Sequence, residues 1–304
     1  MRTNEAATSP SARPLCIWRL MDGKPGHESQ TLGLVSALER LTTVQVHTIS
    51  LAPLRIGFWH WLLKRFAPGA NLPAPDLIIG AGHRTHWRLL AARRCYGGRA
   101  VALMSPSLPT WCFDTVVAPE HDGLSGANVI QTRGVLNAMR PGEKRAGSTL
   151  VLVGGEGKHF AWDDAAVFRA VSQLASAHED LQITDSRRTP PALRQQLAEA
   201  FASSYQPWES CPQGWLHGQL ASAEMAWVTE DSVSMIYEAL SAACRVGLIG
   251  LTGGRGRLAQ GIARLERDGL VTRWAVGTNQ PALNARVAVL AEADRVANIL
   301  LSPN

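Results

Sequence analysis

The chain has 304 residues, enough for two domains, because single domains usually contain roughly 100–200 residues. A hydrophobic content of 46% with 18% charged residues excludes a disordered or fibrous protein, and no apolar run reaches the ~20 residues of a membrane-spanning helix. The net charge of +5 suits anionic partners, namely phosphate ligands, nucleic acid or an anionic bilayer surface, without choosing among them.

The first half of the chain alternates apolar strands with helices and glycine turns. Residues 1–14 are polar and rich in Pro and Ser, and they predict a disordered tail. Strands are then expected at 15–20, 44–51, 75–80, 100–104 and 115–118, with helices around 34–41 and 85–94. This alternation predicts a parallel sheet with helices on both faces, and we assign residues 15–140 to an N-terminal domain.

One segment interrupts the alternation. Residues 54–66, LRIGFWHWLLKRF, place aromatic side chains among Arg55, Lys64 and Arg65 in a helical pattern. Helices of this composition can lie on a membrane surface, so we consider contact with an anionic membrane or with a lipid-linked acceptor. The alternative is an amphipathic helix that packs on the sheet.

The alternation resumes after a polar stretch with Pro and Gly at 138–148, which is typical of a linker. Strands are expected at 149–153, 181–184, 225–228, 246–251 and 271–275. Helices are expected after Asp163, after Thr189-Pro190, after Ser232, and from 281 to about 301. We assign 149–280 to a C-terminal domain and 281–304 to a helix that could pack back on the N-terminal domain. The predicted fold class is α/β, with two Rossmann-like doubly wound domains facing a cleft.

Residues 227–251 read as strand, polar turn, helix and strand. Asp231 or Ser232 can cap this helix and leave other backbone N–H groups free for a ligand. A helix N-terminus binds phosphate, and the hydroxyls of Ser232 and Ser234 would add donors. Glu238, about two turns along, could accept both hydroxyls of a ribose, as an acidic residue does in dinucleotide folds. The alternative is an ordinary capped helix with a surface glutamate.

Polar turns follow several of the predicted strands, where ligands of open parallel sheets bind. These turns are 22–27, 80–83, 154–159, 185–188 and 230–232. Lys158, Arg187 and Arg188 could neutralise a diphosphate, because preorganised cations stabilise a departing anion. His27 and His83 are candidate general bases, because each lies in a glycine turn of the first half. The alternative for these histidines is stabilisation of the loop.

Several other classes of site lack their motifs. The sequence has no GxxxxGK[ST], no complete G-x-G-x-x-G, no H-E-x-x-H and no paired cysteines, so we expect neither a bound cofactor nor a metal. Glu120-His121-Asp122 only loosely matches the pair of carboxylates that binds a divalent cation in other proteins. The five scattered cysteines indicate reduced thiols, and we expect a cytoplasmic protein, either free or peripheral to a membrane. Nucleic acid is the least expected partner, because the sequence contains no known nucleic-acid-binding motif.

Six stretches together resemble the mitochondrial-fission "elongated mitochondria" family and its bacterial relatives. They are DGKPGHESQTLGL (22–34), FDTVVAPEHDG (113–123), NVIQTRGVLN (128–137), VLVGGEGKHFAW (151–162), VTEDSVSMIYEAL (228–240) and RLAQGIARLERDGLVTR (257–273). The resemblance covers nearly the whole chain after residue 14. That family is similar to the two-domain GT-B nucleotide-sugar glycosyltransferases, related in architecture to the lipid-linked N-acetylglucosamine transferases of peptidoglycan and lipid A synthesis.

The resemblance implies roles for individual residues. His27 matches a functional histidine near the acceptor, and Glu238 matches the acidic residue that grips the donor ribose. The helix N–H groups that hold the diphosphate correspond to Ser232, Val233 and Ser234. The glycine loop of the donor domain corresponds to Gly154, Gly155 and Lys158. The chain departs from the family at 252–257, where TGGRGR replaces an aromatic and basic run, and at 261–262, where a Phe-His pair is expected. The resemblance therefore does not extend to a role of this segment in substrate contact.

We therefore predict a metal-independent GT-B-type glycosyltransferase that transfers a sugar from a nucleotide-sugar to an unknown acceptor. His27 is the predicted catalytic base. The predicted ligand-binding residues are Gly23, Gly26, His83, Gly154, Gly155, Lys158, Arg187, Arg188, Asp231, Ser232, Val233, Ser234 and Glu238. The nucleotide-sugar is a substrate, and no separate cofactor is expected. The alternatives are an epimerase or hydrolase of the nucleotide-sugar, and a non-catalytic interaction protein at a membrane.

Overall fold

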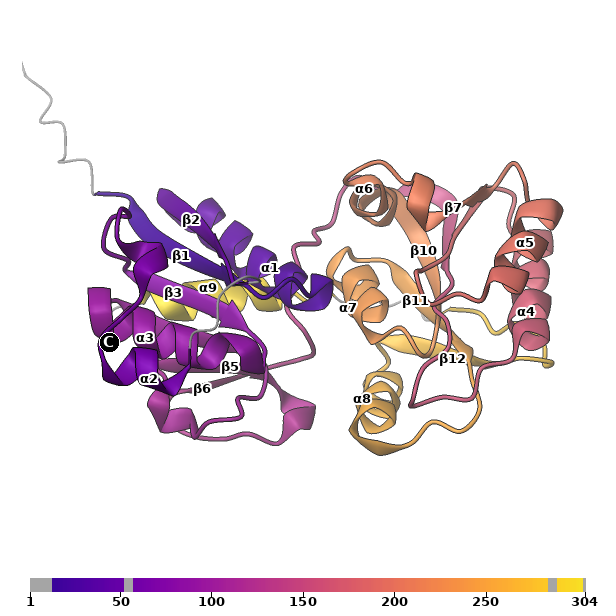
Figure 1. Ribbon diagram of the computed structural model, residues 1–304. Coiled ribbons are helices and arrows are strands. Elements are labelled where there is room, and N and C mark those ends of the chain that lie inside the picture. The colour runs from indigo at the N-terminus through magenta and orange to yellow at the C-terminus, as the bar shows by residue number, and fades with distance from the viewer. Residues whose placement is uncertain (1–12, 52–56, 284–288, 303–304) are drawn as a thin grey trace, which may run out of the picture.

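The chain folds around two parallel six-stranded sheets with helices on both faces (Figure 1). The computed structural model describes residues 13–51, 57–283 and 289–302. The predicted α/β class with two doubly wound domains is confirmed. Most of the predicted tail at 1–14 lies outside the described residues.

The N-terminal sheet has the strand order β2-β1-β3-β4-β5-β6. Its strands are β1 (Leu15–Met21), β2 (Val44–Ser50), β3 (Leu77–Ala81), β4 (Arg99–Leu103), β5 (Thr115–Pro119) and β6 (Val129–Thr132). Its helices are α1 (Pro25–Leu41), α2 (Phe58–Leu62) and α3 (His86–Tyr96). Successive strand residues face opposite sides, so Ile17 packs in the cluster that contains α1 and Trp18 in the cluster that contains α3. Helices therefore cover both faces of this sheet.

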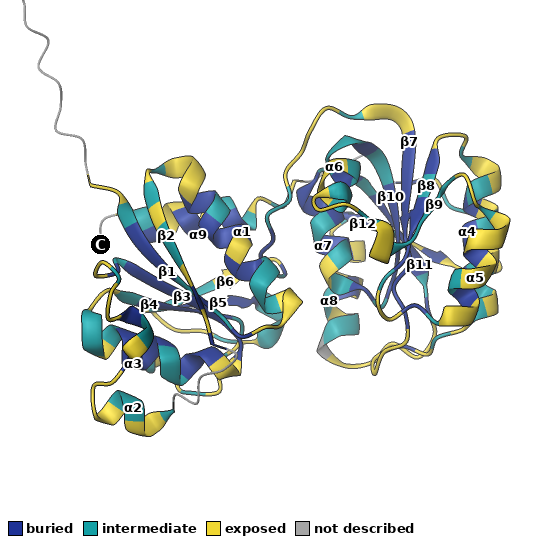
Figure 2. Cartoon of the chain, turned by 45° about the horizontal axis from the view of Figure 1, so that its top comes forward, coloured by how far each residue is buried: buried dark blue, intermediate teal, exposed yellow. Residues whose placement is uncertain are grey.

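The C-terminal sheet has the order β12-β11-β10-β7-β8-β9. Its strands are β7 (Arg145–Leu152), β8 (Leu181–Thr184), β9 (Tyr205–Gln206), β10 (Ala223–Thr229), β11 (Arg245–Gly250) and β12 (Val271–Ala275). Its helices are α4 (Asp164–Ala177), α5 (Pro191–Ala200), α6 (Trp215–Ser222), α7 (Val233–Ser241) and α8 (Gly256–Arg267). The strands are buried along most of their length, whereas the outer faces of the helices are exposed (Figure 2).

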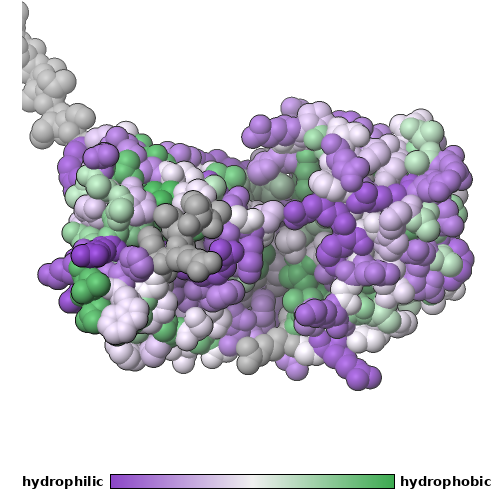
Figure 3. Space-filling model, viewed as in Figure 1, coloured by the Kyte–Doolittle hydropathy of each residue, from purple (hydrophilic) through white to green (hydrophobic). Residues whose placement is uncertain are grey.

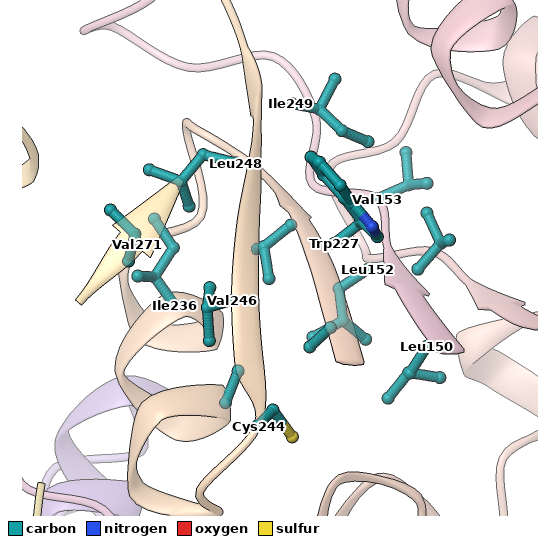
Figure 4. Packing of buried hydrophobic residues seen from close by; sticks show 14 of the residues in the cluster. Leu150, Leu152, Val153, Trp227, Ile236, Cys244, Val246, Leu248, Ile249 and Val271 are labelled. Atoms are coloured by element: carbon teal, nitrogen blue, oxygen red, sulfur yellow. The ribbon is translucent and has the colours of Figure 1, made fainter. Parts of the chain in front are cut away.

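The core of the C-terminal sheet fixes the position of α7. Ile236 of α7 packs in one cluster with Val246 and Leu248 of β11 (Figure 4). The ring of Trp227 covers Gly247 so closely that a Cβ there would lie 2.4 Å from its Cε3. The two strands and the helix thus form one rigid unit, because interiors packed to this density tolerate little movement.

The chain returns to its N-terminal half at the end. The last helix, α9 (Glu292–Leu301), packs against α1, with an ion pair between Arg40 and Asp294. Its buried face contributes Val296 and Leu300 to the cluster on that side of the sheet.

Several predicted boundaries were wrong. The last helix begins at Glu292 and not at 281, where the described residues 281–283 and 289–291 are not helical. The Leu290 carbonyl accepts from the Ser241 hydroxyl at 2.9 Å, so this part of the chain makes a tertiary contact instead of a helical hydrogen bond. β7 begins at Arg145, inside the predicted linker, because Arg145 already pairs with Ala223 of β10. The sequence pattern also missed the short strands β6 and β9.

The two aromatic and glycine-rich segments also differ from expectation. The helix predicted at 54–66 is helical in its described part only over Phe58–Leu62, and Lys64 follows in a left-handed conformation with φ of 51°. Residues 52–56 lie outside the described residues. The predicted turn at 22–27 overlaps the start of α1, because Pro25 occupies the first turn of the helix, where its missing N–H loses no hydrogen bond.

Candidate functional site

The two halves of the chain meet at a hollow with hydrophilic residues on its rim (Figure 3). On the C-terminal side, a pocket of about 550 Å³ lies between the turn after β8 and the start of α7. It brings together the predicted residues Arg187, Arg188, Ser232 and Ser234. Its remaining lining is Thr184, Asp185, Ser186, Trp208, Cys211, Trp215, Leu216 and Met235. The pocket combines an aromatic wall with cations and hydroxyls.

The N-terminus of α7 opens on this pocket without a side-chain cap. Ser232 is the N-cap residue, but its side chain accepts no hydrogen bond from the helix, so the predicted capping by Ser232 or Asp231 is wrong. The first N–H groups of a helix have no partner within it, so those of Val233 and Ser234 depend on solvent or a ligand. Together with the helix dipole they attract an anion.

Asp231 instead links three loops. Its side chain is 2% exposed and accepts from the Gly155 N–H at 3.0 Å and from the Arg188 guanidinium at 2.6 Å. Arg188 also donates to the carbonyls of Gly155 and Glu156, each at 3.0 Å. The carboxylate is therefore committed to this cross-loop contact, which positions Arg188 at the pocket.

Gly154 and Gly155 allow these loops to approach each other. A Cβ on Gly154 would lie 2.3 Å from Asp231 Oδ2, and one on Gly155 would lie 2.0 Å from the Arg188 carbonyl oxygen. The Gly154 N–H donates to the Thr229 hydroxyl at 2.7 Å. Both amides thus have protein acceptors, so packing explains these glycines, and their contact with a ligand stays a prediction.

Two predicted cations remain available to an anion. Lys158 and Arg187 are exposed, and within the described part of the chain neither side chain forms a hydrogen bond or ion pair. Arg187 lines the pocket, whereas Lys158 lies in the turn after β7 and does not. The positive charge at the pocket is therefore supplied by Arg187 and Arg188.

Glu238 lies one turn further along α7 than Ser234, on the same helix face. The residue keeps part of its surface exposed, yet burial raises the pKa of its carboxyl from 4.5 to about 7. Among the described residues, no group forms a hydrogen bond with this carboxyl. Such a group can change its charge near neutral pH when a ligand binds.

His27 lies in the first turn of α1, on the N-terminal side of the junction. Its Nδ1 is 3.0 Å from Asp22 Oδ2, and the Asp22 side chain is fully buried. The ring also packs on Gly82, where a Cβ would lie 2.2 Å from His27 Cε1. Asp22 therefore fixes the ring and leaves Nε2 as the nitrogen that can exchange a proton with a substrate. Sequence reasoning did not assign Asp22 this role, although Asp22 precedes His27 by only five residues.

The other predicted residues of this half lie around His27. Gly23 has φ of 84° in the turn after β1, and Gly26 occupies the first turn of α1. His83 is exposed in η2 (His83–Thr85), directly after Gly82. None of these residues lines the pocket beside α7. The predicted residues thus fall into two groups, one on each half of the chain.

The described part of 54–66 packs on α3. Phe58 and Trp61 contact Trp87 with ring centroids 5.3 and 6.1 Å apart, and the Arg94 guanidinium lies 4.8 Å from the Trp61 ring centroid. Trp59 nevertheless remains 67% exposed, and Phe58, Leu62 and Leu63 are exposed as well. One side of α2 is therefore packed, and the other presents apolar side chains to solvent.

The candidate divalent-cation residues have other partners. Glu120 forms an ion pair with Arg264 at 2.6 Å, and His121 lies 3.9 Å from Asp122. Nowhere in the described chain do three His, Cys, Asp or Glu residues gather as metal ligands. Each helix in the same residues is too short or too polar to span a bilayer.

Trp208 and Trp215 are pocket residues that sequence reasoning missed. The backbone N–H of Trp208 donates to the Asp185 carboxylate at 2.7 Å, and the Arg194 guanidinium lies 5.7 Å from the Trp208 ring centroid. Trp208 begins the short helix η5 (Trp208–Ser210) and Trp215 begins α6, two elements that the sequence pattern did not predict. Only the three-dimensional arrangement places them beside α7.

Solved structures with the same two-sheet architecture identify the fold. A protein assigned as a UDP-N-acetylglucosamine 2-epimerase from Listeria monocytogenes is 14% identical, with a TM-score of 0.55 over 95% of this chain and 88% of its own. Acinetobacter baumannii MurG is 12% identical, with a TM-score of 0.55 over 94% of this chain and 99% of its own. S. aureus MnaA with UDP is 14% identical, with a TM-score of 0.51 over 95% and 88%. The chain has the GT-B fold of nucleotide-sugar glycosyltransferases and epimerases.

The family follows from the sequence comparison. A family model described as mitochondrial fission ELM1 matches residues 25–303, so the chain belongs to this family. An uncharacterized protein of Rickettsia prowazekii is 23% identical over 284 aligned residues, which cover 74% of this chain and 80% of the relative. The predicted resemblance is confirmed.

Proposed function

We propose that this chain binds a nucleoside diphosphate sugar beside α7 and transfers the sugar to an acceptor on the N-terminal side. The observation that carries this proposal is the pocket of about 550 Å³, which combines an uncapped helix N-terminus with Arg187 and Arg188. The diphosphate lies at the N-terminus of α7, and the base lies against Trp208 or Trp215. Glu238 accepts the ribose hydroxyls. Support comes from the fold, whose solved neighbours include a complex with UDP.

The transfer step assigns a role to each charged group. His27 Nε2 takes the proton of the acceptor hydroxyl, and the freed oxygen attacks the anomeric carbon of the sugar. The bond from that carbon to the phosphate oxygen breaks, and the nucleoside diphosphate leaves with the bonding electrons. Arg187, Arg188 and the α7 N–H groups stabilise its charge. Closure of the two halves excludes water, which would otherwise act as acceptor.

A thermal-shift screen with nucleoside diphosphates and their sugars tests donor binding. A ligand at about 100 times its dissociation constant adds about 2.7 kcal/mol to the free energy of unfolding and raises the melting temperature by a few degrees. Replacing Glu238 by Ala weakens donor binding by about 1–3 kcal/mol, because a charged hydrogen bond is lost. Gln195→Ala, on the exposed face of α5, is the matched control. The absence of a shift with every nucleotide would sink the proposal.

An epimerase or hydrolase of the same nucleotide-sugar is the second candidate, because epimerases share this fold. Such an enzyme uses the same pocket with water or a sugar proton as the reacting group. Release of free nucleoside diphosphate, or formation of an epimeric sugar, in the absence of any acceptor favours this candidate over transfer.

The exposed side of α2 supports a peripheral membrane contact. Trp59, Leu62 and Leu63 face solvent beside the exposed Lys64 and Arg65, and this combination favours the boundary between headgroups and acyl chains. Co-sedimentation with anionic vesicles is expected for the native chain and is expected to fall for Trp59→Glu. Equal pelleting with neutral and anionic vesicles, or none with either, contradicts an anionic membrane partner.

A further inference from the structure

A cavity of about 230 Å³ lies where the two halves of the chain meet. Its N-terminal wall comes from η4 (Glu120–Asp122) and the turn after β6, and its C-terminal wall comes from α7 and α8, which border the N-terminal half (Figure 1). This cavity shares no lining residue with the pocket beside α7. A group that occupies it therefore contacts both halves at once.

Tyr237 of α7 brings a hydroxyl without a partner to this cavity. The residue is 5% exposed and lines the cavity, and within the described part of the chain its hydroxyl forms no hydrogen bond. Burial raises the pKa of Tyr237 to about 12, the charge of Glu120 raises it further, and Arg264 lowers it, so the hydroxyl lies within electrostatic reach of both cavity residues. Because buried polar groups are nearly always hydrogen-bonded, an unpaired hydroxyl at a cavity indicates a partner that enters the cavity.

The ring of Tyr237 is held in place by the opposite half. Gly134, in the turn after β6, has φ of 86°, and a Cβ on it would lie 2.2 Å from Tyr237 Cε1. Only glycine allows both this backbone conformation and this close approach. The hydroxyl is therefore positioned by the packing of its ring and not by a hydrogen bond of its own.

The ionisable side chains around the cavity carry an excess of positive charge. Arg264 pairs with Glu120 at 2.6 Å, and Arg133 lies 3.5 Å from Asp268. Arg267 also lines the cavity and is exposed, and among the described residues it has no ion pair or hydrogen bond. Three guanidinium groups thus face two carboxylates. This excess favours an anion over a cation as the occupant.

The size of the cavity and its remaining polar groups suit a small oxyanion. Gln260 and His121 line the wall and can donate N–H groups, and the Tyr237 hydroxyl can donate as well. Guanidinium groups match the oxygens of a phosphate in geometry and charge. The cavity is smaller than the about 300–1,000 Å³ of sites for drug-sized ligands, so its occupant is smaller than a nucleotide-sugar.

We propose that this cavity binds a phosphate-sized oxyanion that holds the two halves in the arrangement seen here. The Tyr237 hydroxyl donates to one of its oxygens, and Arg267 neutralises its charge. Because the anion contacts both halves only when they are together, its binding stabilises this arrangement over a more open one. That the same movement closes the pocket beside α7 around a donor rests on the proposed function, whereas the anion site does not.

Titration of sodium phosphate into the full chain, followed by NMR of the backbone amides, tests the site. The Gly134 and Gly261 amides, which both lie at the cavity, are expected to shift and saturate with phosphate but not with sodium chloride of equal ionic strength. Tyr237→Phe and Arg267→Gln are each expected to weaken this binding by about tenfold, the loss of roughly one charge-assisted hydrogen bond. Without phosphate, Tyr237→Phe should keep the native midpoint of urea unfolding, because the ring still packs on Gly134.

Matched variants separate the cavity from other sources of the signal. Tyr205→Phe makes the same change on β9, at the opposite edge of the C-terminal sheet from β12, and Arg140→Ala removes an exposed cation of the linker. Neither should change phosphate binding. Arg187→Ala removes a cation of the pocket beside α7 and should leave the response of the two glycine amides unchanged. Native phosphate affinity in Tyr237→Phe, or loss of this response in Arg187→Ala, overturns the proposal.

Small-angle X-ray scattering measures the effect of the anion on the two halves. Phosphate is expected to lower the radius of gyration more than chloride of equal ionic strength does. Tyr237→Phe should need about tenfold more phosphate for the same decrease. A radius of gyration that responds equally to the two salts overturns the role of the anion in holding the halves together.

Glucose 1-phosphate distinguishes a phosphate ester from the free ion. Tighter binding of the ester than of inorganic phosphate identifies an ester as the occupant, and weaker binding identifies the free ion. Phosphate binding at Gly134 together with a failure of every nucleotide to bind would refute the donor assignment alone. Nucleotide binding without a phosphate response at Gly134 would refute the anion site alone.

Discussion

The carboxyl group of Glu238 connects the proposed donor site to pH. Its pKa rises to about 7 because burial penalises the charged form. The folded state therefore binds this proton more tightly than the unfolded state, where the pKa is 4.5. The contribution of Glu238 to stability falls as pH rises between these two values. The ionised form, which accepts ribose hydroxyls best, predominates only above pH 7.

Nucleotide affinity is consequently expected to rise with pH between about 6 and 8, because the carboxyl becomes ionised over this range. Calorimetric titration at several pH values measures this rise, and Glu238→Gln should abolish it. The same variant should gain stability relative to the native chain as pH increases from 4.5 to 7 in urea unfolding. Parallel pH profiles for the two proteins would show that Glu238 does not contact the ligand.

Asp22 holds the proposed base in place. It contacts His27 Nδ1 at 3.0 Å, and its second oxygen accepts from the Lys24 N–H at 3.1 Å. Asp22→Asn keeps the shape but removes the charge that stabilises a protonated ring. The expected result is a fall in kcat of about a hundredfold, the scale of general base catalysis, with little change in KM for the nucleotide-sugar. A change in KM alone, with kcat intact, would assign Asp22 a structural role instead.

At the scale of elements, the Asp231 carboxylate holds together the loops after β7, β8 and β10. Asp231→Ala removes the acceptor of the Gly155 N–H and of Arg188. Because a buried donor left unpaired costs about 1–3 kcal/mol, the free energy of unfolding should fall by that amount in urea titration. Ser234→Ala, on the exposed side of the same helix start, should leave stability within about 0.5 kcal/mol of the native value. Equal stability of the two variants contradicts the cross-loop role.

Local sequence signals explain part of these elements. The strand Val271–Ala275 and the strand Leu181–Thr184 could be predicted at both ends, because short apolar runs between turns bury in a parallel sheet. Asp231 could not be assigned, since its carboxylate can cap α7 or bind a distant loop, and the choice depends on the position of Arg188 some 43 residues away in sequence. His27 could be selected from its turn, but Trp208 required the folded chain.

At the scale of the whole molecule, side chains on α8 contact the N-terminal half. Arg264 forms an ion pair with Glu120 at 2.6 Å, and Arg133 lies 3.5 Å from Asp268. A cavity of about 230 Å³ remains between these groups, lined by residues of both halves. Both ion pairs are partly exposed, and polar contacts of this kind permit relative movement of domains. The two halves can therefore open without breaking either core.

The ion pair between Arg264 and Glu120 should set the balance between open and closed arrangements of the two halves. Arg264→Glu places like charges opposite each other, so the radius of gyration measured by small-angle X-ray scattering should increase at low salt. Exposed pairs are worth about 0.2–1 kcal/mol, which shifts the ratio of the two forms by only about 1.4- to 5-fold. Adding Glu120→Arg to Arg264→Glu restores an attractive pair and should return the native value. Because salt screens exposed charges, all three proteins should converge near 1 M salt. A radius of gyration that is insensitive to both charge and salt would place the control of closure at the linker contact between Asn137 and Ser241 instead.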